Sequence, residues 1–314
     1  MRQFLLLILS MVWVLPANAV IHGSAADPVS VSTGKISIDQ LRWHASVKGL
    51  ITETSECSSV VVGTSPLTLL TAAHCLRNAR LNPVTKTPLI QLFLGVPVPP
   101  IRAAVYSEYD SLDENMARDI AVLIFDGDAP SSVEAVPVTP ASASPKALLC
   151  GYGQGYKAMV TEVPSCAIKP LMTADEEFQR FVPDTYEPLD PLLYMQFRTQ
   201  FEAKKLLLRS YNALLAVNRL HQNEYQTSLP MPTRGDSGGP WMINLPGPKR
   251  GVVALTSFIE TFYRKNKQWP FFKQTRAPLS DFPYVAYGVR LDTDEARAIF
   301  KQARLLGADI DTWQ

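Results

Sequence analysis

The stretch Thr233-Arg234-Gly235-Asp236-Ser237-Gly238-Gly239-Pro240 decides how the rest of this sequence is interpreted. It places one hydroxyl, that of Ser237, among glycines and next to the carboxylate of Asp236. Glycines allow a tight loop whose backbone N–H groups come close to a bound molecule. A serine hydroxyl is a weak nucleophile at neutral pH, so a reactive Ser237 needs a base within hydrogen-bond reach and a third group that orients the base.

Two upstream segments supply candidates for these two groups. His74 lies in the run Leu69-Leu70-Thr71-Ala72-Ala73-His74-Cys75, and Asp119 lies in the run Arg118-Asp119-Ile120-Ala121-Val122-Leu123. The apolar run after Asp119 predicts a buried strand, which carries its first residue inward. A buried carboxylate needs a partner. An N–H of the His74 ring fits this need, and the bond sets the tautomer whose other nitrogen accepts the Ser237 proton.

Taken together, the three segments resemble the trypsin-like (chymotrypsin-fold) serine endopeptidases. In that family T-A-A-H-C, D-I-A-L-L and G-D-S-G-G-P mark the three members of a catalytic triad, in the order found here. The resemblance implies peptide-bond hydrolysis through an acyl-enzyme on Ser237, with His74 as general base and Asp119 as the orienting acid. It also implies an oxyanion hole made by the N–H groups of Gly235 and Ser237, a protein or peptide substrate, and no cofactor.

The resemblance implies an all-β fold of two packed six-stranded Greek-key β-barrels. Short runs of branched residues, with 25 prolines against 16 glycines, also favour strands and turns. We expect residues 20–138 to form the first barrel and residues 139–314 the second. Asp292 to Leu306 has early acids, late basic residues and a following Gly307, so the sequence predicts a C-terminal α-helix.

Two stretches of the second barrel, residues 170–230 and 260–283, do not match the family and are expected to be insertions. Within the first, Phe197 to Leu220 combines apolar and basic residues that predict an amphipathic helix packed on the barrel. A membrane-surface or partner-binding role is the alternative for this helix. The second insertion is aromatic and basic, and it either shapes the substrate cleft or extends a barrel loop.

The four cysteines allow three disulfide pairings. By the resemblance, Cys57 and Cys75 form the bridge that fixes the loop of the catalytic histidine. Cys150 and Cys166 do not lie where the family's usual second-barrel bridges lie, and we expect them to pair with each other. Free thiols are an alternative that export disfavours. No metal site is expected, because His44 has no second ligand at metal-binding spacing.

Residues 1–19 have the features of a cleavable signal peptide. Arg2 is followed by an apolar run from Phe4 to Leu15 and by Ala17-Asn18-Ala19, an A-x-A cleavage site. The apolar run is shorter than the ~20 residues that cross a bilayer as a helix. We therefore expect a secreted or periplasmic protein without stable membrane insertion; a signal anchor is the alternative.

Cleavage after Ala19 frees the segment Val20-Ile21-His22-Gly23, which resembles the mature start of the family. There the new α-amino group inserts into the core and pairs with the acid before the nucleophile, here Asp236. The sequence has no Lys or Arg between Arg2 and Val20 at which a propeptide could be cut. Our hypothesis is that signal removal itself produces the activating terminus. The alternative is that Val20 and Ile21 only begin the first strand of an ordinary mature chain.

The resemblance assigns the primary specificity pocket to Met231, Ala254, Thr256 and Gly288. The thioether of Met231 carries no fixed charge, so strict cleavage after Arg or Lys is not expected, and a small or medium apolar residue is the preferred guess. Ala254 stands where the family usually has a serine. We therefore expect the hydroxyl that supports the buried aspartate to be missing.

The composition argues against nucleic-acid binding, and two alternatives to a peptidase are weighed against the motifs. The net charge of +1, with 19% charged residues, gives no electrostatic case for nucleic-acid binding. A non-catalytic binding relative would normally lose a triad member, and this chain keeps all three. An esterase of the α/β-hydrolase type would have G-x-S-x-G directly after a strand and the order Ser, Asp, His. The order here is His, Asp, Ser, which disfavours this type. The chain is expected to be a monomer.

Overall fold

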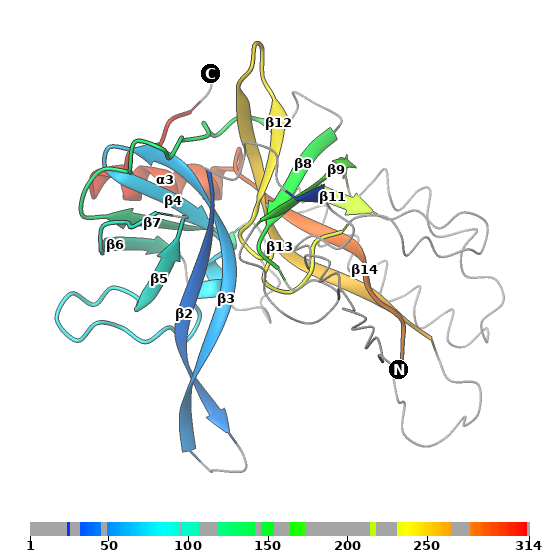
Figure 1. Cartoon of the computed structure of the whole chain (residues 1–314), viewed down its shortest axis with the longest axis horizontal. Coiled ribbons are helices and arrows are strands. Elements are labelled where there is room, and N and C mark those ends of the chain that lie inside the picture. Colours follow the sequence, from blue (N-terminus) through cyan, green and yellow to red (C-terminus); the bar gives the residue numbers. More distant parts are fainter. Residues whose placement is uncertain are drawn as a thin grey trace, which may run out of the picture.

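Figure 1 shows the computed structural model, which is mostly β. The structure describes residues 24–25, 32–44, 49–94, 96–106, 118–141, 146–153, 164–173, 214–217, 231–264 and 277–312. Residues 1–23 lie outside these ranges, so the predicted signal peptide and the segment starting at Val20 remain predictions.

The first half of the chain forms one antiparallel sheet of six strands, in the spatial order β5-β2-β3-β4-β7-β6. Its strands are β2 (Thr33–His44), β3 (Gly49–Thr64), β4 (Leu67–Thr71), β5 (Ile90–Phe93), β6 (Ile101–Tyr106) and β7 (Ala121–Phe125). A 3-10 turn, η2 (Ala73–Leu76), follows β4. This sheet agrees with the six strands expected for the first barrel.

The second sheet is also antiparallel but has eight strands among the described residues, in the order β1-β9-β8-β12-β13-β14-β11-β10. Its strands are β1 (Ser24–Ala25), β8 (Lys146–Gly151), β9 (Ser165–Pro170), β10 (Met172–Thr173), β11 (Leu214–Val217), β12 (Pro240–Asn244), β13 (Arg250–Arg264) and β14 (Ala277–Arg290). The two sheets curl as half-barrels that lie side by side in Figure 1. The prediction of six strands is therefore wrong for the second sheet.

Strand β7 is buried on both faces, and this explains its unbroken apolar sequence. Ala121, Leu123 and Phe125 pack into the interior of the first sheet. Val122 and Ile124 point the other way, into a cluster shared with the second sheet and the C-terminal helix. Successive side chains of a strand point to opposite faces. Burial on both faces fixes the strand, and with it the carboxylate of Asp119, two residues before its start.

The predicted C-terminal helix is confirmed as α3 (Asp294–Leu305). Its first turn is capped by Thr293, whose hydroxyl accepts a hydrogen bond from the N–H of Ala296 at 3.2 Å. Ile299 and Phe300 are buried on one face of the helix, in the cluster shared by both sheets. The helix therefore covers the side where the two sheets meet.

The predicted helix from Phe197 to Leu220 is wrong at Leu214–Val217. These four residues form β11 and pair with residues 285–288 of β14. Short apolar runs do not distinguish a helix from a strand, and here the available edge of β14 pairs with the run. The rest of the predicted helix lies outside the described residues.

The second expected insertion, residues 260–283, continues a hairpin where it is described. β13 runs to Arg264 and β14 begins at Ala277, with Arg264 opposite Ala277. This supports the extended-loop alternative for the described part. Residues 265–276 lie outside the described ranges.

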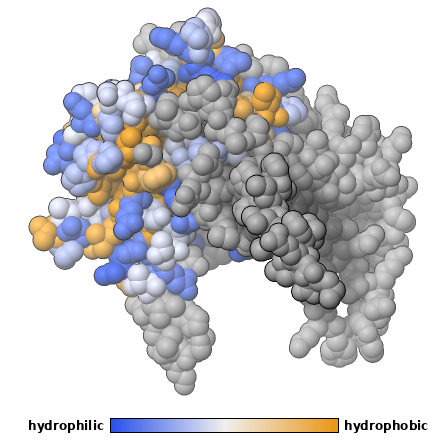
Figure 2. All heavy atoms as spheres, viewed as in Figure 1, coloured by the Kyte–Doolittle hydropathy of each residue, from blue (hydrophilic) through white to orange (hydrophobic). Residues whose placement is uncertain are grey.

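On the face drawn in Figure 2, hydrophilic and hydrophobic residues are interspersed over the described surface. Among the described residues, no helix combines the length and the apolar character needed to span a membrane.

Gly63 is the position at which the C-terminal segment approaches the first sheet most closely. A β-carbon there would lie 1.7 Å from the carbonyl oxygen of Asp309. That residue is held in place because its carboxylate accepts the N–H of Thr64 at 2.9 Å and of Ser65 at 3.1 Å. Gly63→Ala is expected to lower the free energy of unfolding by about 2 to 4 kcal/mol in chemical denaturation.

The matched control is Gly247→Ala, at an exposed turn where a β-carbon meets nothing within 4 Å. Its backbone φ of +82° still disfavours alanine, so we expect a loss of about 1 kcal/mol. Equal losses in the two variants would contradict the packing role of Gly63.

Candidate active site

The structure brings His74 and Asp119 together as a hydrogen-bonded pair. Nδ1 of His74 lies 2.8 Å from Oδ2 of Asp119, and the backbone N–H of His74 donates to Oδ1 at 2.8 Å. The Asp119 side chain is fully buried, whereas that of His74 is 29% exposed. Both the ring and the backbone of His74 are therefore oriented by one carboxylate. With the Nδ1 proton directed at Asp119, Nε2 of the neutral ring is the nitrogen that can accept a proton.

A third group holds the Asp119 carboxylate. The hydroxyl of Ser257, which is 2% exposed, donates a short hydrogen bond to Oδ2 of Asp119. The expectation that this support is missing at Ala254 is therefore wrong. Ser257 is the bulged residue of β13: Thr256 pairs with Gly288 and Phe258 with Tyr287, so no residue of β14 lies opposite Ser257. A bulge re-aims a side chain next to a site, and no pattern in the sequence marks this one.

The surroundings of His74 shift its pKa in two directions. Burial lowers the pKa, while the negative charge of Asp119 and the hydrogen bond to it raise it. The net effect is a pKa above the ordinary 6.5. The structure therefore stabilises the imidazolium, as expected of a base that takes a proton during a reaction.

The loop around Ser237 is fixed against the first sheet by backbone bonds. The N–H of Ser58 donates to the carbonyl of Ser237 at 2.7 Å, and the Ser58 hydroxyl donates to the carbonyl of Gly235 at 2.9 Å. Gly238 has a φ of +78°, and a β-carbon there would lie 2.4 Å from the carbonyl oxygen of Ser58. Only glycine fits this position, so the glycine-rich sequence is explained by a close approach between the two sheets.

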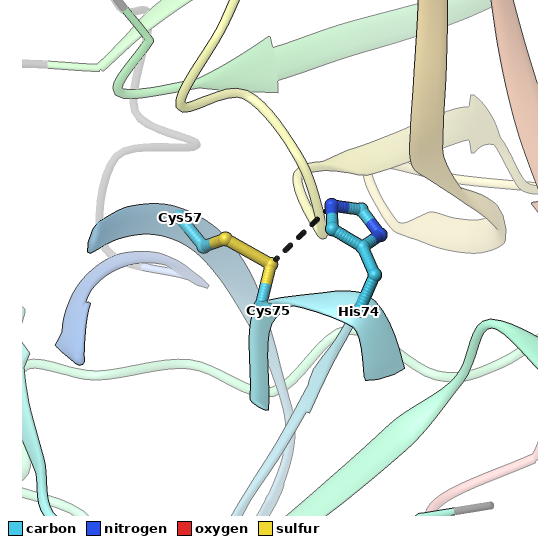
Figure 3. A group of neighbouring side chains, drawn as sticks. All are labelled: Cys57, His74 and Cys75. Carbon is cyan, nitrogen blue, oxygen red and sulfur yellow. Dashed lines mark hydrogen bonds between the residues drawn. A yellow bond between two sulfur atoms is a disulfide. The ribbon is translucent and has the colours of Figure 1, made fainter. Parts of the chain in front are cut away.

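Ser237 and His74 both lie at the disulfide that joins β3 to η2. The Sγ atom of Cys75 is 3.9 Å from Nε2 of His74 and 3.8 Å from the carbonyl oxygen of Ser237. Figure 3 shows the imidazole beside this disulfide. The structure thus brings the three predicted catalytic residues to one place, with Ser237 and His74 both half-buried.

The nucleophile loop has two backbone donors without a described acceptor. In the described part of the chain, no group accepts a hydrogen bond from the N–H of Gly235 or of Ser237. Gly235 has a φ of +92°, a left-handed conformation that permits successive N–H groups to converge. Both residues are half-buried.

The Asp236 carboxylate is buried beneath the loop. It accepts the N–H of Gly153 at 2.8 Å, and the N–H and hydroxyl of Thr233 at 2.7 and 3.2 Å. Burial raises the pKa of Asp236 to about 7, although these hydrogen bonds act to lower it. The predicted partner, the α-amino group of Val20, lies outside the described residues. This carboxylate is therefore partly satisfied by hydrogen bonds but has no described cation beside it.

Both predicted disulfides are present, and no described cysteine is free. Cys57 is bonded to Cys75, and Cys150 to Cys166. The ligand atoms of Cys57, His74 and Cys75 lie within 4.8 Å of one another. Because both sulfurs belong to one disulfide, they are not thiolates, and this cluster does not have the donors of a metal site.

The four residues assigned to the specificity pocket are buried around Trp241. Met231 and Ala254 belong to the core cluster of the second sheet, together with Trp241. The indole N–H donates to the hydroxyl of Thr256 at 2.9 Å. At Gly288 a β-carbon would lie 2.9 Å from the indole ring. Trp241 is thus the residue that the sequence analysis missed here, and Gly288 is required by its packing.

The family model described as Trypsin matches residues 9–189. The matched region includes His74, Asp119 and both disulfides, and it ends before the loop of Ser237. No curated protein matches the chain.

The pKa of His74 tests the pair with Asp119. Asp119→Asn removes the charge that raises this pKa and leaves the burial that lowers it. We expect NMR titration of the imidazole to give a value below the ordinary 6.5 in this variant. Ser257→Ala keeps the charge of Asp119, so the His74 pKa should stay above 6.5 there. A raised value in both variants would mean that Asp119 does not control the ring.

Proposed function

Because the chain belongs to the trypsin family, we propose that it is a serine endopeptidase that uses Ser237, His74 and Asp119 to hydrolyse peptide bonds. The observation that carries this proposal is the 2.8 Å bond between Nδ1 of His74 and the buried Asp119, beside a glycine loop that presents Ser237. A base oriented by a buried acid, next to a hydroxyl, is the arrangement that nucleophilic catalysis by serine requires.

In the proposed reaction, the Ser237 hydroxyl attacks the carbonyl carbon of the substrate while His74 takes its proton at Nε2. The imidazolium is stabilised by Asp119, which stays ionised. When the tetrahedral intermediate collapses, His74 gives the proton to the leaving amine and an acyl-enzyme remains on Ser237. Water then attacks the ester, with His74 again as base, and releases the acid product.

The oxyanion of each intermediate is proposed to accept hydrogen bonds from the N–H groups of Gly235 and Ser237. One such donor contributes about 3 to 4 kcal/mol of barrier lowering. The bond from the Ser58 hydroxyl to the Gly235 carbonyl at 2.9 Å supports this role, because it fixes the Gly235–Asp236 peptide unit, which lies between the two units that carry the donors. Donors held in advance need no rearrangement during the reaction.

We propose that the freed α-amino group of Val20 activates the site by pairing with Asp236. Ala25 of β1 pairs with Ser165, and Ser165 pairs with Gly151. A β-carbon at Gly151 would lie 2.2 Å from Oδ1 of Asp236. From Ala25, five residues of extended chain reach roughly 17 Å. Asp236 lies about two strand spacings, or roughly 10 Å, across the sheet, so Val20 can reach it.

Export and specificity remain proposals that rest on the sequence. Signal removal after Ala19 would both release the protein to the periplasm or medium and produce Val20. The thioether of Met231, which is 1% exposed, offers no charge for an Arg or Lys side chain. We therefore retain a preference for an apolar residue before the cleaved bond, in a protein or peptide substrate.

Two alternatives are separated by labelling with an active-site-directed phosphonate together with a peptide-cleavage assay. A binding protein without activity would not react with an active-site-directed phosphonate. An esterase would react but would not cleave peptides. The retained pair of His74 and Asp119, with its carboxylate held by Ser257, favours an enzyme over a binding protein, because it is the oriented base that a serine nucleophile needs.

Labelling with a fluorophosphonate tests the nucleophile. The mature protein should be labelled on Ser237, and Ser237→Ala should fold normally but lose the label. Because the mechanism needs neutral His74, kcat/KM should rise with pH through a midpoint above 6.5. Retained labelling in Ser237→Ala would contradict the assignment. A kcat/KM that falls as pH rises through this midpoint would contradict it as well.

The activation proposal predicts different pH dependences for two forms of the chain. In a chain extended by Ala19, the amine of Val20 cannot pair, and the pKa of Asp236 stays raised to about 7. The folded state then keeps a proton that the unfolded chain releases near 3.8. This contribution to stability is full below 3.8 and is lost as pH rises through about 7.

In the chain that begins at Val20, the ammonium keeps Asp236 ionised. The free energy of unfolding should therefore fall less between pH 3.8 and about 7 than in the extended chain. Thermal unfolding at a series of pH values measures the difference, and the extended chain should also be labelled more slowly by the phosphonate. Identical pH profiles, or a secreted protein that begins elsewhere than Val20, would count against the proposal.

A further inference from the structure

Three side chains that can bind a metal meet at the proposed active site. Cys57 and Cys75 form a disulfide beside the ring of His74, and the two sulfurs and a ring nitrogen all lie within 4.8 Å of one another. Figure 3 shows this group, in which Sγ of Cys75 is 3.9 Å from Nε2 of His74. Within the described part of the chain, no other group of three or more such ligands occurs.

The oxidation state of the two sulfurs decides whether they can bind a metal. In the disulfide they cannot, because the thiolate is the ligand. A phosphine reduces the bond by giving two electrons to the sulfurs and taking the oxygen of a water molecule, whose two protons leave both sulfurs as thiols. The sulfurs then separate to non-bonded contact, and each can lose its proton to a bound metal. The chain is synthesised with free thiols, so the reduced form also precedes the disulfide.

The spacing of the three ligand atoms suits zinc. Zn²⁺ binds thiolate sulfur at about 2.3 Å and imidazole nitrogen at about 2.0 to 2.1 Å, with tetrahedral geometry. These bond lengths place neighbouring ligand atoms roughly 3.5 to 3.8 Å apart. The 3.9 Å between Nε2 of His74 and Sγ of Cys75 is already close to this separation. Two thiolates and one imidazole leave the fourth position to water.

The histidine already has the support that a metal-binding histidine needs. A ligating imidazole donates its other ring N–H to a carboxylate or carbonyl, which fixes the ring and makes the ligating nitrogen more basic. Here Nδ1 of His74 donates to Oδ2 of Asp119 at 2.8 Å, and the hydroxyl of Ser257 holds the same carboxylate. The lone pair of Nε2 is therefore presented on the side of the sulfurs. Because the His74 side chain is 29% exposed, an ion can reach it from solvent.

The balance of charge favours a divalent ion. Cys57 and Cys75 are buried, and burial disfavours a thiolate that has no cation beside it. One divalent ion offsets the charge of two thiolates, and the neutral imidazole adds none. The reduced group thus offers a neutral site for Zn²⁺ in surroundings that would resist two isolated negative charges.

We propose that the reduced chain binds Zn²⁺ through Cys57, Cys75 and Nε2 of His74, and that formation of the disulfide expels the ion. With zinc bound, Nε2 cannot take the proton of Ser237, so the base is blocked. The oxidant is the disulfide of a thiol–disulfide oxidoreductase, which takes two electrons from the thiolates and two protons from solvent to become a dithiol. The Cys57–Cys75 bond and a released Zn²⁺ remain. Only the effect on activity rests on the proposed function.

Metal binding is measured on the mature full-length Ser237→Ala protein, so that it does not depend on turnover. The protein is reduced with a phosphine, the reagent is removed, and stoichiometric Co²⁺ is added as a coloured substitute for Zn²⁺. The reduced protein should show the sulfur-to-cobalt absorption of thiolate ligands, which Zn²⁺ should abolish, and the oxidised protein should not show it. Zn²⁺ should also protect Cys57 and Cys75 from alkylation by iodoacetamide, as located by peptide mass spectrometry.

Paired variants locate the site. Cys150→Ala/Cys166→Ala removes the other disulfide, which belongs to no such ligand group in the described ranges, and should keep the cobalt absorption. Cys57→Ala/Cys75→Ala should lose it. His74→Ala should weaken Co²⁺ binding by more than the roughly 10- to 100-fold that loss of a ligand's supporting hydrogen bond costs. The alkylation measurement needs no cysteine variant, so it decides the matter if one of them does not fold.

The block of the base is measured by fluorophosphonate labelling of the chain that keeps Ser237. Reduced protein with Zn²⁺ should be labelled about 10²- to 10⁴-fold more slowly than the same protein after a chelator, the factor that a general base contributes. The same concentration of Zn²⁺ should leave the oxidised protein unaffected. Equal slowing of both forms would place the ion elsewhere and would overturn the inference.

The inference and the proposed function fail separately. Missing sulfur-to-cobalt absorption in the reduced protein, or equal alkylation of Cys57 and Cys75 with and without Zn²⁺, would overturn the zinc site even if the phosphonate labels Ser237. Cobalt absorption together with protection of both cysteines supports the site, and does so even in an oxidised protein that fails to react with the phosphonate.

Discussion

The buried carboxylate of Asp119 is the constraint on which the site depends. A carboxylate that is fully removed from water is tolerated only when its oxygens are bonded, and removing one partner of such a group costs about 3 to 5 kcal/mol. Here the ring and backbone of His74 and the hydroxyl of Ser257 supply those bonds. His74 lies in η2, which follows strand β4 of the first sheet, and Ser257 lies in β13 of the second sheet. One carboxylate thus requires that both sheets be correctly folded and packed before the histidine is oriented.

The contact between the sheets is made possible by small residues. Gly238 approaches the carbonyl of Ser58 so closely that a β-carbon would overlap it, and Gly239 approaches the carbonyl of Cys150 in the same way. The glycines of the nucleophile loop are therefore explained by two different neighbours, one in each sheet. The second disulfide lies at this junction, because Cys150 and Cys166 belong to the cluster shared by the two sheets and α3. The geometry of the proposed site therefore depends on how the two sheets pack.

The predictions that failed did so where local sequence does not specify a partner. The run at Leu214–Val217 is apolar enough for a helix or a strand, and the edge of β14 decided for a strand. By the family resemblance, Ala254 stands at the position whose hydroxyl supports the aspartate of the triad. A bulge in β13 turns Ser257 toward Asp119 instead. One extra residue in a strand changes which side chains share a face. Nothing in the spacing of hydrophobic residues reports such an irregularity.

The sequence by itself determined which residues carry the proposed chemistry. The three segments around His74, Asp119 and Ser237, the disulfide between Cys57 and Cys75, and the caps of α3 are local patterns whose residue types have few other uses. The tertiary structure alone decided the support of Asp119 by Ser257 and the packing of Gly288 against Trp241. Each of these depends on which strands become neighbours and in what register. That choice is set by the burial of whole sheets, and no single segment contains it.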